Sequence, residues 1–156
     1  MKNTIKIATI LPYKENYTTS KAQAAAIWVC DFFKDSKYKD NNYIFGNTKG
    51  KDYLTKNYIN INIGNLKSKL SSSTNEYCKN FIKKVKNNNF DIIEIHNRPL
   101  VFNYLKKQID SKFILYFHND PISMNGSETK NERLKLLDEL DKIIFVSKWV
   151  QNRFFE

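Results

Sequence analysis

The stretch DIIEIHNRP, residues 91–99, decides the fold class when it is set beside FILYFHNDP, residues 113–121. Each stretch is a run rich in apolar residues that ends in His-Asn, one further residue and Pro. Strands that are covered on both faces of a parallel sheet carry apolar residues on consecutive positions in this way. The shared pattern therefore indicates two parallel strands, each followed by a polar loop.

Six short runs rich in Ile, Phe, Tyr and Val recur along the 156 residues, and helical patterns lie between most of them. This alternation predicts an α/β fold with a Rossmann-like, doubly wound and mostly parallel sheet of about six strands. The predicted strands are residues 5–11, 43–47, 58–63, 91–96, 112–118 and 142–147. The predicted helices are residues 20–35, 73–86, 99–109, 129–141 and 148–156, and residues 64–74 form a Ser-rich linker.

Polar residues before three of the helices predict where these helices begin. The cap candidates are Thr19 and Ser20 for the first helix, Ser73 with Glu76 for the second and Thr129 with Glu132 for the fourth. The apolar spacing of the fourth helix predicts a buried face made of Leu134, Leu137 and Leu140.

The net charge is +10, but 23 of the 26 basic residues are Lys. Arg, whose guanidinium fork reads phosphates and guanine edges, is nearly absent, which weighs against nucleic-acid recognition. The apolar run near the N-terminus is too short for a signal peptide or a membrane span. We therefore expect a cytoplasmic protein, and the scattered lysines leave peripheral contact with the inner face of a membrane open.

If the strand order is the common 3-2-1-4-5-6, the carboxyl ends of the first, fourth and fifth strands converge where open parallel sheets bind ligands. Both His-Asn pairs then project into one crevice, where Asp120 could orient the imidazole of His118. The structural alternative is also open, because a His at a strand end is often only a hydrogen-bonding residue and Asn in a turn before Pro is ordinary loop chemistry.

Other kinds of site lack their sequence patterns. The two histidines have no HxxxH or HxH spacing for a metal, and no GxSxG or GxGxxG motif supports a serine nucleophile or a dinucleotide site. Cys30 and Cys78 have no CxxC partner and fall in predicted helices, so we expect them to be core thiols.

In the order of its pieces the chain resembles the N-terminal, acceptor-side domain of retaining glycosyltransferases of the GT-B fold, family 4. The resemblance covers nearly the whole chain, and its pieces are ILPYKE (10–15), SKAQAAAIWVCDFF (20–33), DIIEIHNRP (91–99), FILYFHNDP (113–121) and LDELDKIIFVSKWVQNRF (137–154). It implies that residues 1–156 are one half of a GT-B fold. It also implies transfer of a hexosyl-type sugar from a nucleotide-sugar to a glycan or lipid-linked acceptor of surface polysaccharide or lipopolysaccharide synthesis, with no metal or other cofactor.

By this resemblance His118 is the catalytic candidate, because it matches the family's His beside the transferred sugar. The fourth strand end matches the part that faces the acceptor, and the loop of residues 13–21 matches the segment that approaches the donor phosphates and the acceptor. The substrate-binding candidates are therefore Tyr13, Thr19, Ser20, Lys21, His96, Asn97, Arg98, Asn119 and Asp120.

The sequence departs from the family in two ways. The first loop reads TTSKAQAAA where the family carries Gly residues that let amides approach phosphate, and there is no second Rossmann-like domain with its acidic pair seven residues apart. The last helix also stops in mid-pattern, with Phe154 and Phe155 lacking a partner. We therefore expect a missing C-terminal nucleotide-sugar domain, and an isolated chain that is inactive and self-associates.

Two other classes of protein remain as alternatives. A non-catalytic binding module of the flavodoxin-like or receiver type shares the fold class, although a receiver has an acidic cluster after its first strand, where this chain has only Glu15. A basic membrane-surface or nucleic-acid-binding protein would follow from the charge, and salt-dependent binding to duplex DNA would favour it.

Overall fold

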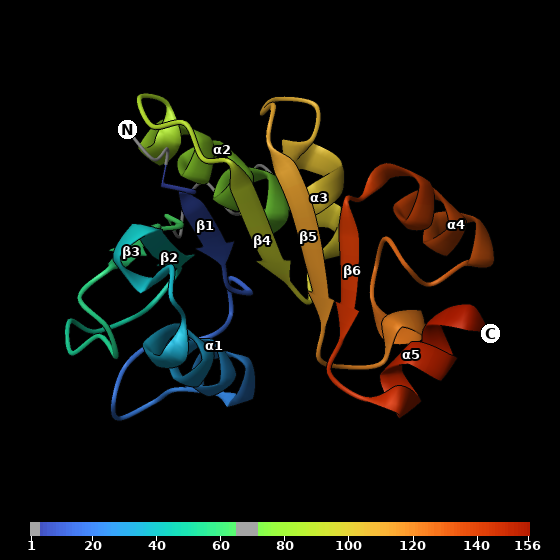
Figure 1. The fold of residues 1–156 in the computed structure, drawn as a ribbon, viewed down its shortest axis with the longest axis horizontal. Coiled ribbons are helices and arrows are strands. Elements are labelled where there is room, and N and C mark those ends of the chain that lie inside the picture. The colour runs from blue at the N-terminus through green and yellow to red at the C-terminus, as the bar shows by residue number, and fades with distance from the viewer. Residues whose placement is uncertain (1–3, 65–71) are drawn as a thin grey trace.

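The strands form one parallel sheet of six strands in the order β3-β2-β1-β4-β5-β6, in a computed structural model that describes residues 4–64 and 72–156. The strands are β1 (Ile7–Ile10), β2 (Asn42–Gly46), β3 (Tyr58–Asn60), β4 (Ile92–His96), β5 (Lys112–Phe117) and β6 (Lys142–Phe145). Both the predicted fold class and the order 3-2-1-4-5-6 are confirmed. The first, fourth and fifth strands therefore lie side by side (Figure 1).

Helices connect successive strands along most of the chain, as a parallel sheet requires. They are α1 (Ala24–Asp35), α2 (Ser73–Val85), α3 (Pro99–Leu105), α4 (Lys130–Glu139) and α5 (Lys148–Phe155), with short 3-10 turns η1 (Lys39–Asn41) and η3 (Pro121–Ser123). Each of the five α-helices lies within a predicted helix range, and most of them end earlier than predicted. Of the predicted linker, residues 65–71 lie outside the described residues. None of the described helices is long and apolar enough to cross a membrane.

Two apolar layers hold the helices on opposite faces of the sheet. On one face, Phe81 of α2 and Phe102 of α3 pack with Ile93 of β4 and other buried side chains. On the other face, α1 packs over β2 through a smaller cluster that includes Val29 and Ile44. Full burial of an aromatic or aliphatic side chain stabilises the fold by about 1.5–3 kcal/mol, so the larger cluster fixes the positions of β4 and β5. The buried free thiols Cys30 and Cys78 confirm the prediction of core cysteines.

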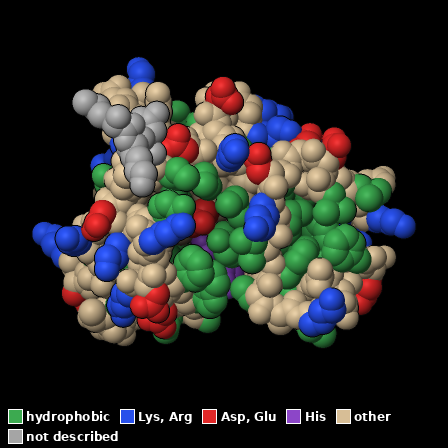
Figure 2. Space-filling view, viewed as in Figure 1, with side chains coloured by type: hydrophobic (Ala, Val, Ile, Leu, Met, Phe, Trp, Pro, Cys, Tyr) green, Lys and Arg blue, Asp and Glu red, His purple; other side chains and the backbone are tan. Residues whose placement is uncertain are grey.

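The face of the sheet that α1 covers is bare over β6 and over the amino ends of β4 and β5, whereas Trp28 of α1 packs on the carboxyl ends of β4 and β5. In Figure 1 α2 and α3 lie behind these strands and no helix lies in front of them, and Figure 2 shows hydrophobic side chains gathered on this front face. Ile114 and Ile144 are only half-buried, and Val146 and Trp149 are exposed. Parallel sheets are usually covered on both faces, so this half of the sheet is an apolar surface suited to a further layer.

The predicted caps of the first two helices are wrong. Gln23 is the N-cap of α1, and the hydroxyl groups of Thr19 and Ser20 donate to the carboxylate of Asp52 instead. Helix α2 is capped by the residue before the predicted one: the side chain of Ser72 accepts from a backbone N–H of the first turn. The carboxylate of Glu76 accepts from the backbone N–H of Gly64, so Ser73 and Glu76 form no capping box.

The capping box of Thr129 and Glu132 in α4 is confirmed. The predicted buried face of this helix is wrong, because Leu134 and Leu137 are exposed, whereas Leu136 is buried. Helix α4 lies at the edge of the sheet against α5, and the buried guanidinium of Arg133 takes the position beside Leu136. Leu140 was predicted to be buried, and it is half-buried against the larger cluster.

Phe154 and Phe155 were both expected to lack a packing partner, and this prediction holds for Phe155 only. Phe154 is buried, because α5 folds back over the sheet edge and places its ring 5.1 Å from that of Phe145 and 5.4 Å from that of Phe117. Phe155 remains 59% exposed.

Candidate functional site

The two His-Asn ends meet at the carboxyl edge of the sheet. Strands β4 and β5 are paired so that His96 lies opposite Tyr116, which brings Nδ1 of His96 within 2.8 Å of Nε2 of His118. The predicted convergence of the two strand ends is therefore confirmed. In Figure 2 the histidines lie at the bottom of a hollow between hydrophobic side chains.

Asn97 locks the two strand ends together. Its side-chain Oδ1 accepts from the backbone N–H of His118 over 2.7 Å and from that of Asn119 over 3.3 Å. To do so Asn97 adopts a left-handed backbone with φ of 53°, a conformation that Asn tolerates better than most residues. The first His-Asn ending thus holds the second, which gives the repeated pattern a structural reason.

Aromatic rings enclose the histidine pair. Tyr116 stacks on His96 with ring centroids 4.5 Å apart, and the ring of Trp28 in α1 meets His118 edge to face at 5.1 Å. His96 is 1% exposed and His118 is half-buried. Burial lowers the pKa of His118 to about 4, and burial together with the neighbouring His118 lowers the pKa of His96 well below its usual value. Both rings are therefore neutral at pH 7.

The neutral pair has a favoured proton arrangement. Among the described residues Nε2 of His96 is buried without a partner. Leaving a lone pair unpaired costs less than leaving an N–H unpaired, so the proton of His96 belongs on Nδ1, from which it is donated to Nε2 of His118. His118 then carries its own proton on Nδ1. The pair would present a neutral hydrogen-bond donor at the crevice, and His96 would act on a ligand only through His118.

A second polar network lies on the same strands, and the sequence analysis missed it. The Glu94 carboxylate of β4 accepts from the hydroxyl of Thr9 over 2.8 Å and from that of Tyr116 over 3.2 Å. Burial raises the pKa of Glu94, against the effect of these two hydrogen bonds. The available signal was a single acidic residue inside an otherwise apolar strand. Because Tyr116 also stacks on His96, the hydrogen bond to Glu94 helps to fix the ring on which His96 packs.

A pocket opens beside Asn97, and we call it the Tyr13–Arg98 pocket. It has a volume of about 240 Å³ and is lined by Tyr13, Lys14, Thr74, Asn97, Arg98, Pro99, Leu100, Ser123, Met124 and Asn125. The Arg98 guanidinium lies over the ring of Tyr13, 5.3 Å from its centroid. The structure thus brings together three predicted site residues from two strand ends and adds Lys14 and Thr74, which the sequence analysis did not select.

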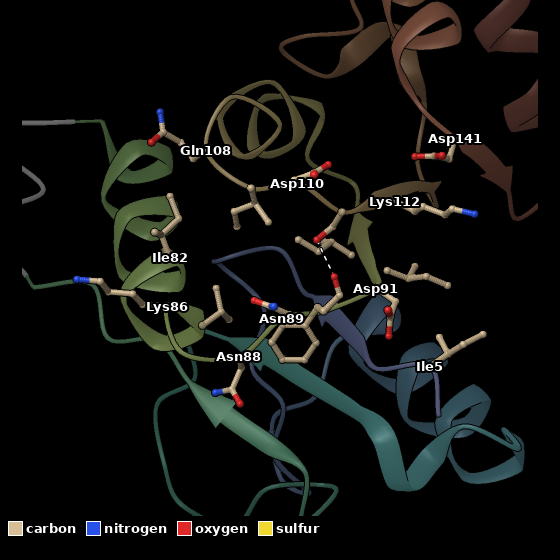
Figure 3. A pocket seen from close by; sticks show the side chains of 16 residues that line it. Ile5, Ile82, Lys86, Asn88, Asn89, Asp91, Gln108, Asp110, Lys112 and Asp141 are labelled. Atoms are coloured by element: carbon tan, nitrogen blue, oxygen red, sulfur yellow. Dashed lines mark hydrogen bonds between the residues drawn. The ribbon is translucent and has the colours of Figure 1, made fainter. Parts of the chain in front are cut away.

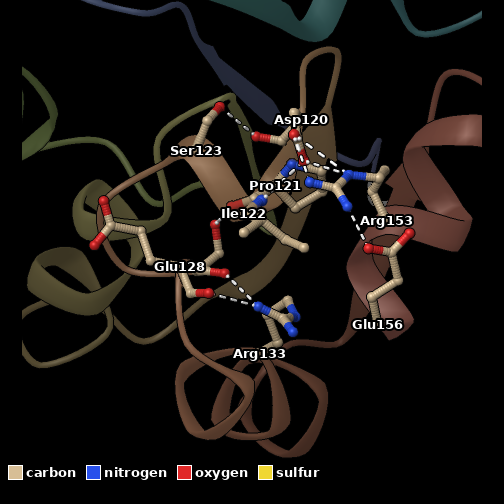
Figure 4. A network of polar contacts seen from close by, with 9 residues as sticks. Asp120, Pro121, Ile122, Ser123, Glu128, Arg133, Arg153 and Glu156 are labelled. Atoms are coloured by element: carbon tan, nitrogen blue, oxygen red, sulfur yellow. Dashed lines mark hydrogen bonds and ion pairs between the residues drawn. The ribbon is translucent and has the colours of Figure 1, made fainter.

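The predicted contact between Asp120 and His118 is wrong. The Asp120 carboxylate pairs with the Arg153 guanidinium of α5, with Nη2 and Oδ2 3.1 Å apart, and accepts from the backbone N–H of Ile122 (Figure 4). Hydrogen bonding with Arg153 is the main cause of the lowered pKa of Asp120. Arg133 completes the network by donating to the backbone carbonyls of Ser127, Glu128 and Phe154. Asp120 therefore fastens the loop after β5 to α5, and Arg133 joins α4 to the end of that loop and to α5.

Three other candidates lie in a loop of their own. The hydroxyl groups of Thr19 and Ser20 bind Asp52, Thr18 forms a bridge with Tyr53, and Lys21 is exposed. These contacts tie residues 16–22 to the β2–β3 connection. Thr19, Ser20 and Lys21 make no hydrogen bond to either histidine and do not line the Tyr13–Arg98 pocket. Asn119 is exposed beside the pair and is held through its backbone.

The amino end of α1 is occupied by a side chain of the first loop. Oε2 of Glu15 accepts from the backbone N–H of Ala26 over 3.1 Å. Burial raises the pKa of Glu15, although that hydrogen bond and the charge of Arg98 act in the opposite direction. Helix amino ends attract anions through their free amides and their dipole. A carboxylate of the chain itself therefore fills this anion position.

A larger cavity than the Tyr13–Arg98 pocket lies at the opposite end of the strands. Its volume is about 1020 Å³, and Ile5, Asp91, Ser111 and Asp141 are among its lining residues (Figure 3). The Ser111 hydroxyl donates to the carbonyl of Phe90 across it over 2.7 Å. Because open α/β sheets bind ligands beyond the carboxyl ends of their strands, we place the candidate site at the histidine pair and the Tyr13–Arg98 pocket.

Comparison with protein-family models finds no match for this chain. Comparison with curated proteins finds no significant relative. Within residues 4–64 and 72–156 there is no group of three or more His, Cys, Asp or Glu side chains able to hold a metal ion. The function therefore has to be inferred from the site itself.

Proposed function

We propose that this chain is the N-terminal, acceptor-side half of a retaining glycosyltransferase similar to GT-B family 4. The observation that carries the proposal is the contact of His96 with His118 at the carboxyl ends of two adjacent central strands. In such a fold this edge is where ligands bind. The reaction is transfer of a sugar from a nucleotide-sugar to a glycan or lipid-linked acceptor in surface polysaccharide or lipopolysaccharide synthesis.

His118 is the catalytic residue in this proposal. A neutral donor at its Nδ1 suits an electron-rich oxygen of the transferred sugar, and a donor fixed before the reaction stabilises charge that develops in the transition state. Its Nε2 lone pair is engaged by His96, so His118 acts as a hydrogen-bond donor rather than as a general base. Asn97 holds the backbone of His118 in place, and Arg98 and Tyr13 face the acceptor.

Recognition of the donor nucleotide belongs to a second domain in this proposal. The Ala26 amide in the first turn of α1, which could otherwise meet a phosphate, is engaged by Glu15. The bare apolar half of the sheet, with Val146 and Trp149 exposed, also favours a partner layer in the working enzyme. Contact of that enzyme with the inner face of a membrane agrees with the charge of +10.

The proposal predicts weak sugar binding without turnover by the 156-residue chain alone. Saturation-transfer NMR with a panel of nucleotide-sugars is expected to show contact of the sugar ring, which His118→Ala removes and Lys142→Gln at the amino end of β6 retains. Radiochemical assays with the same donors and lipid-linked acceptors are expected to show no transfer. Robust turnover by the chain alone would refute the two-domain reading, and a panel without any sugar contact would refute the transferase itself.

A further inference from the structure

The charged side chains that line the Tyr13–Arg98 pocket are cationic. Among the described residues its lining includes Arg98 and Lys14 and no Asp or Glu. The remaining polar lining groups are hydroxyls and amides, from Thr74, Ser123, Asn97 and Asn125. Such groups can donate hydrogen bonds to an oxyanion.

Arg98 is held in place but not neutralised. Its guanidinium is fixed by the ring of Tyr13 and by a 3.0 Å hydrogen bond from Nη1 to the carbonyl of Asn97. Its Nε is buried and has no partner among the described residues. The charge of Arg98 acts on the carboxyl of Glu15, yet the two form no ion pair within the described part of the chain. An unpaired buried donor of a charged group costs free energy, and the charge of an anion bound beside the guanidinium would offset part of that cost.

We propose that the Tyr13–Arg98 pocket binds an oxyanion, the phosphate or carboxylate of an acidic acceptor sugar. This inference rests on the proposed function for its biological meaning and deepens it by naming the acceptor class. The planar Arg98 fork matches either group, and Lys14 adds a point charge at the rim. The volume of about 240 Å³ suits a small headgroup rather than an extended chain. Asn97 joins the pocket to His118, so an anchored acceptor lies beside the transferring sugar.

The test is calorimetry and NMR on the 156-residue chain with four probes: inorganic phosphate, glucose 1-phosphate, glucuronic acid and glucose. The two charged sugars distinguish a phosphate from a carboxylate as the preferred group. We expect at least one of them to bind at least about tenfold more tightly than glucose, the scale of one charge-assisted hydrogen bond. Equal binding of glucose and both charged sugars would overturn the inference.

Matched variants separate the pocket from the overall charge. Arg98→Gln and Lys142→Gln remove the same charge, and only the first is expected to weaken binding about tenfold. Lys14→Gln is expected to weaken it less because Lys14 is exposed, and Arg98→Lys is expected to give an intermediate affinity because it keeps the charge and loses the fork.

An equal loss in Arg98→Gln and Lys142→Gln would assign the binding to net charge and overturn the site. If Arg98→Gln does not fold, Lys14→Gln against Lys142→Gln gives the same decision. The outcome is independent of the proposed activity. Anion binding without any nucleotide-sugar contact at His118 would refute the transferase and leave the anion site in place. Nucleotide-sugar contact at His118 without anion binding would leave a transferase with a neutral acceptor.

Discussion

His118→Ala is expected to lower kcat by roughly 100-fold or more in an enzyme that contains this domain, which is the scale of losing one positioned donor to a developing charge. The loss is expected mainly in kcat, because the hydrogen bond strengthens in the transition state. The same change leaves Nδ1 of the buried His96 unpaired and lowers the free energy of unfolding by about 1–3 kcal/mol. Activity must therefore be measured per folded molecule, with thermal unfolding of the same preparation.

An exposed residue away from the site supplies the control. Lys142 lies at the amino end of β6, opposite to the histidine pair, so Lys142→Gln is expected to keep kcat within about twofold and stability within about 0.5 kcal/mol of the wild type. A His118→Ala enzyme that is destabilised but fully active per folded molecule would remove His118 from the chemistry and leave it a structural partner of His96.

The histidine pair also makes the free energy of unfolding decrease as the pH is lowered. The chain has only two histidines, and the fold lowers the pKa of both, that of His118 from 6.5 to about 4. The unfolded chain therefore takes up protons at these rings before the folded chain does. Stability is complete above about pH 6.5 and is lost as pH falls from there towards 4. The expected slope is at most about 1.4 kcal/mol per pH unit for each proton, and partial exposure of His118 reduces it.

Two carboxyl groups oppose this trend and must be separated from it. Burial raises the pKa of Glu94 and of Glu15, so the folded chain binds their protons first and gains relative stability at low pH. Urea unfolding between pH 7 and about pH 5, compared between wild type and His118→Gln, cancels their contribution because both chains carry them. The wild type is expected to lose stability more steeply. Parallel curves would mean that His118 is not buried against His96 in solution.

Much of the fold was predictable from the sequence because strand runs and helix patterns are local. The apolar runs ending at His96 and His118 gave the paired strands, and the common strand order then placed their ends together. The capping box of Thr129 was also local, since both of its partners lie within one turn.

The contacts that could not be predicted from the sequence involve residues that are far apart along the chain. Asp120 is paired with Arg153, which lies 33 residues away in the sequence. The charged guanidinium of Arg153 attracts the carboxylate more strongly than the neutral ring of His118 does. Thr19 binds Asp52, and the first turn of α1 is bonded by Glu15 from the preceding loop, so the local cap rule selected the wrong residues. The burial of Leu136 rather than Leu134 follows from the position of α4 at the sheet edge, which helical periodicity alone does not define.

The measurement that tests the central claim most directly is nitrogen-15 NMR of the two imidazole rings, with and without a bound sugar. The chain has only two histidines, so every imidazole signal belongs to the pair. We expect both rings to be neutral at pH 7, with His96 protonated at Nδ1 and His118 protonated at Nδ1 and accepting at Nε2. Addition of a nucleotide-sugar is expected to shift the Nδ1–H signal of His118 and to leave that of His96 nearly unchanged. Two independently titrating rings with ordinary pKa values, or a His118 proton on Nε2 that does not respond to any sugar, would contradict the account.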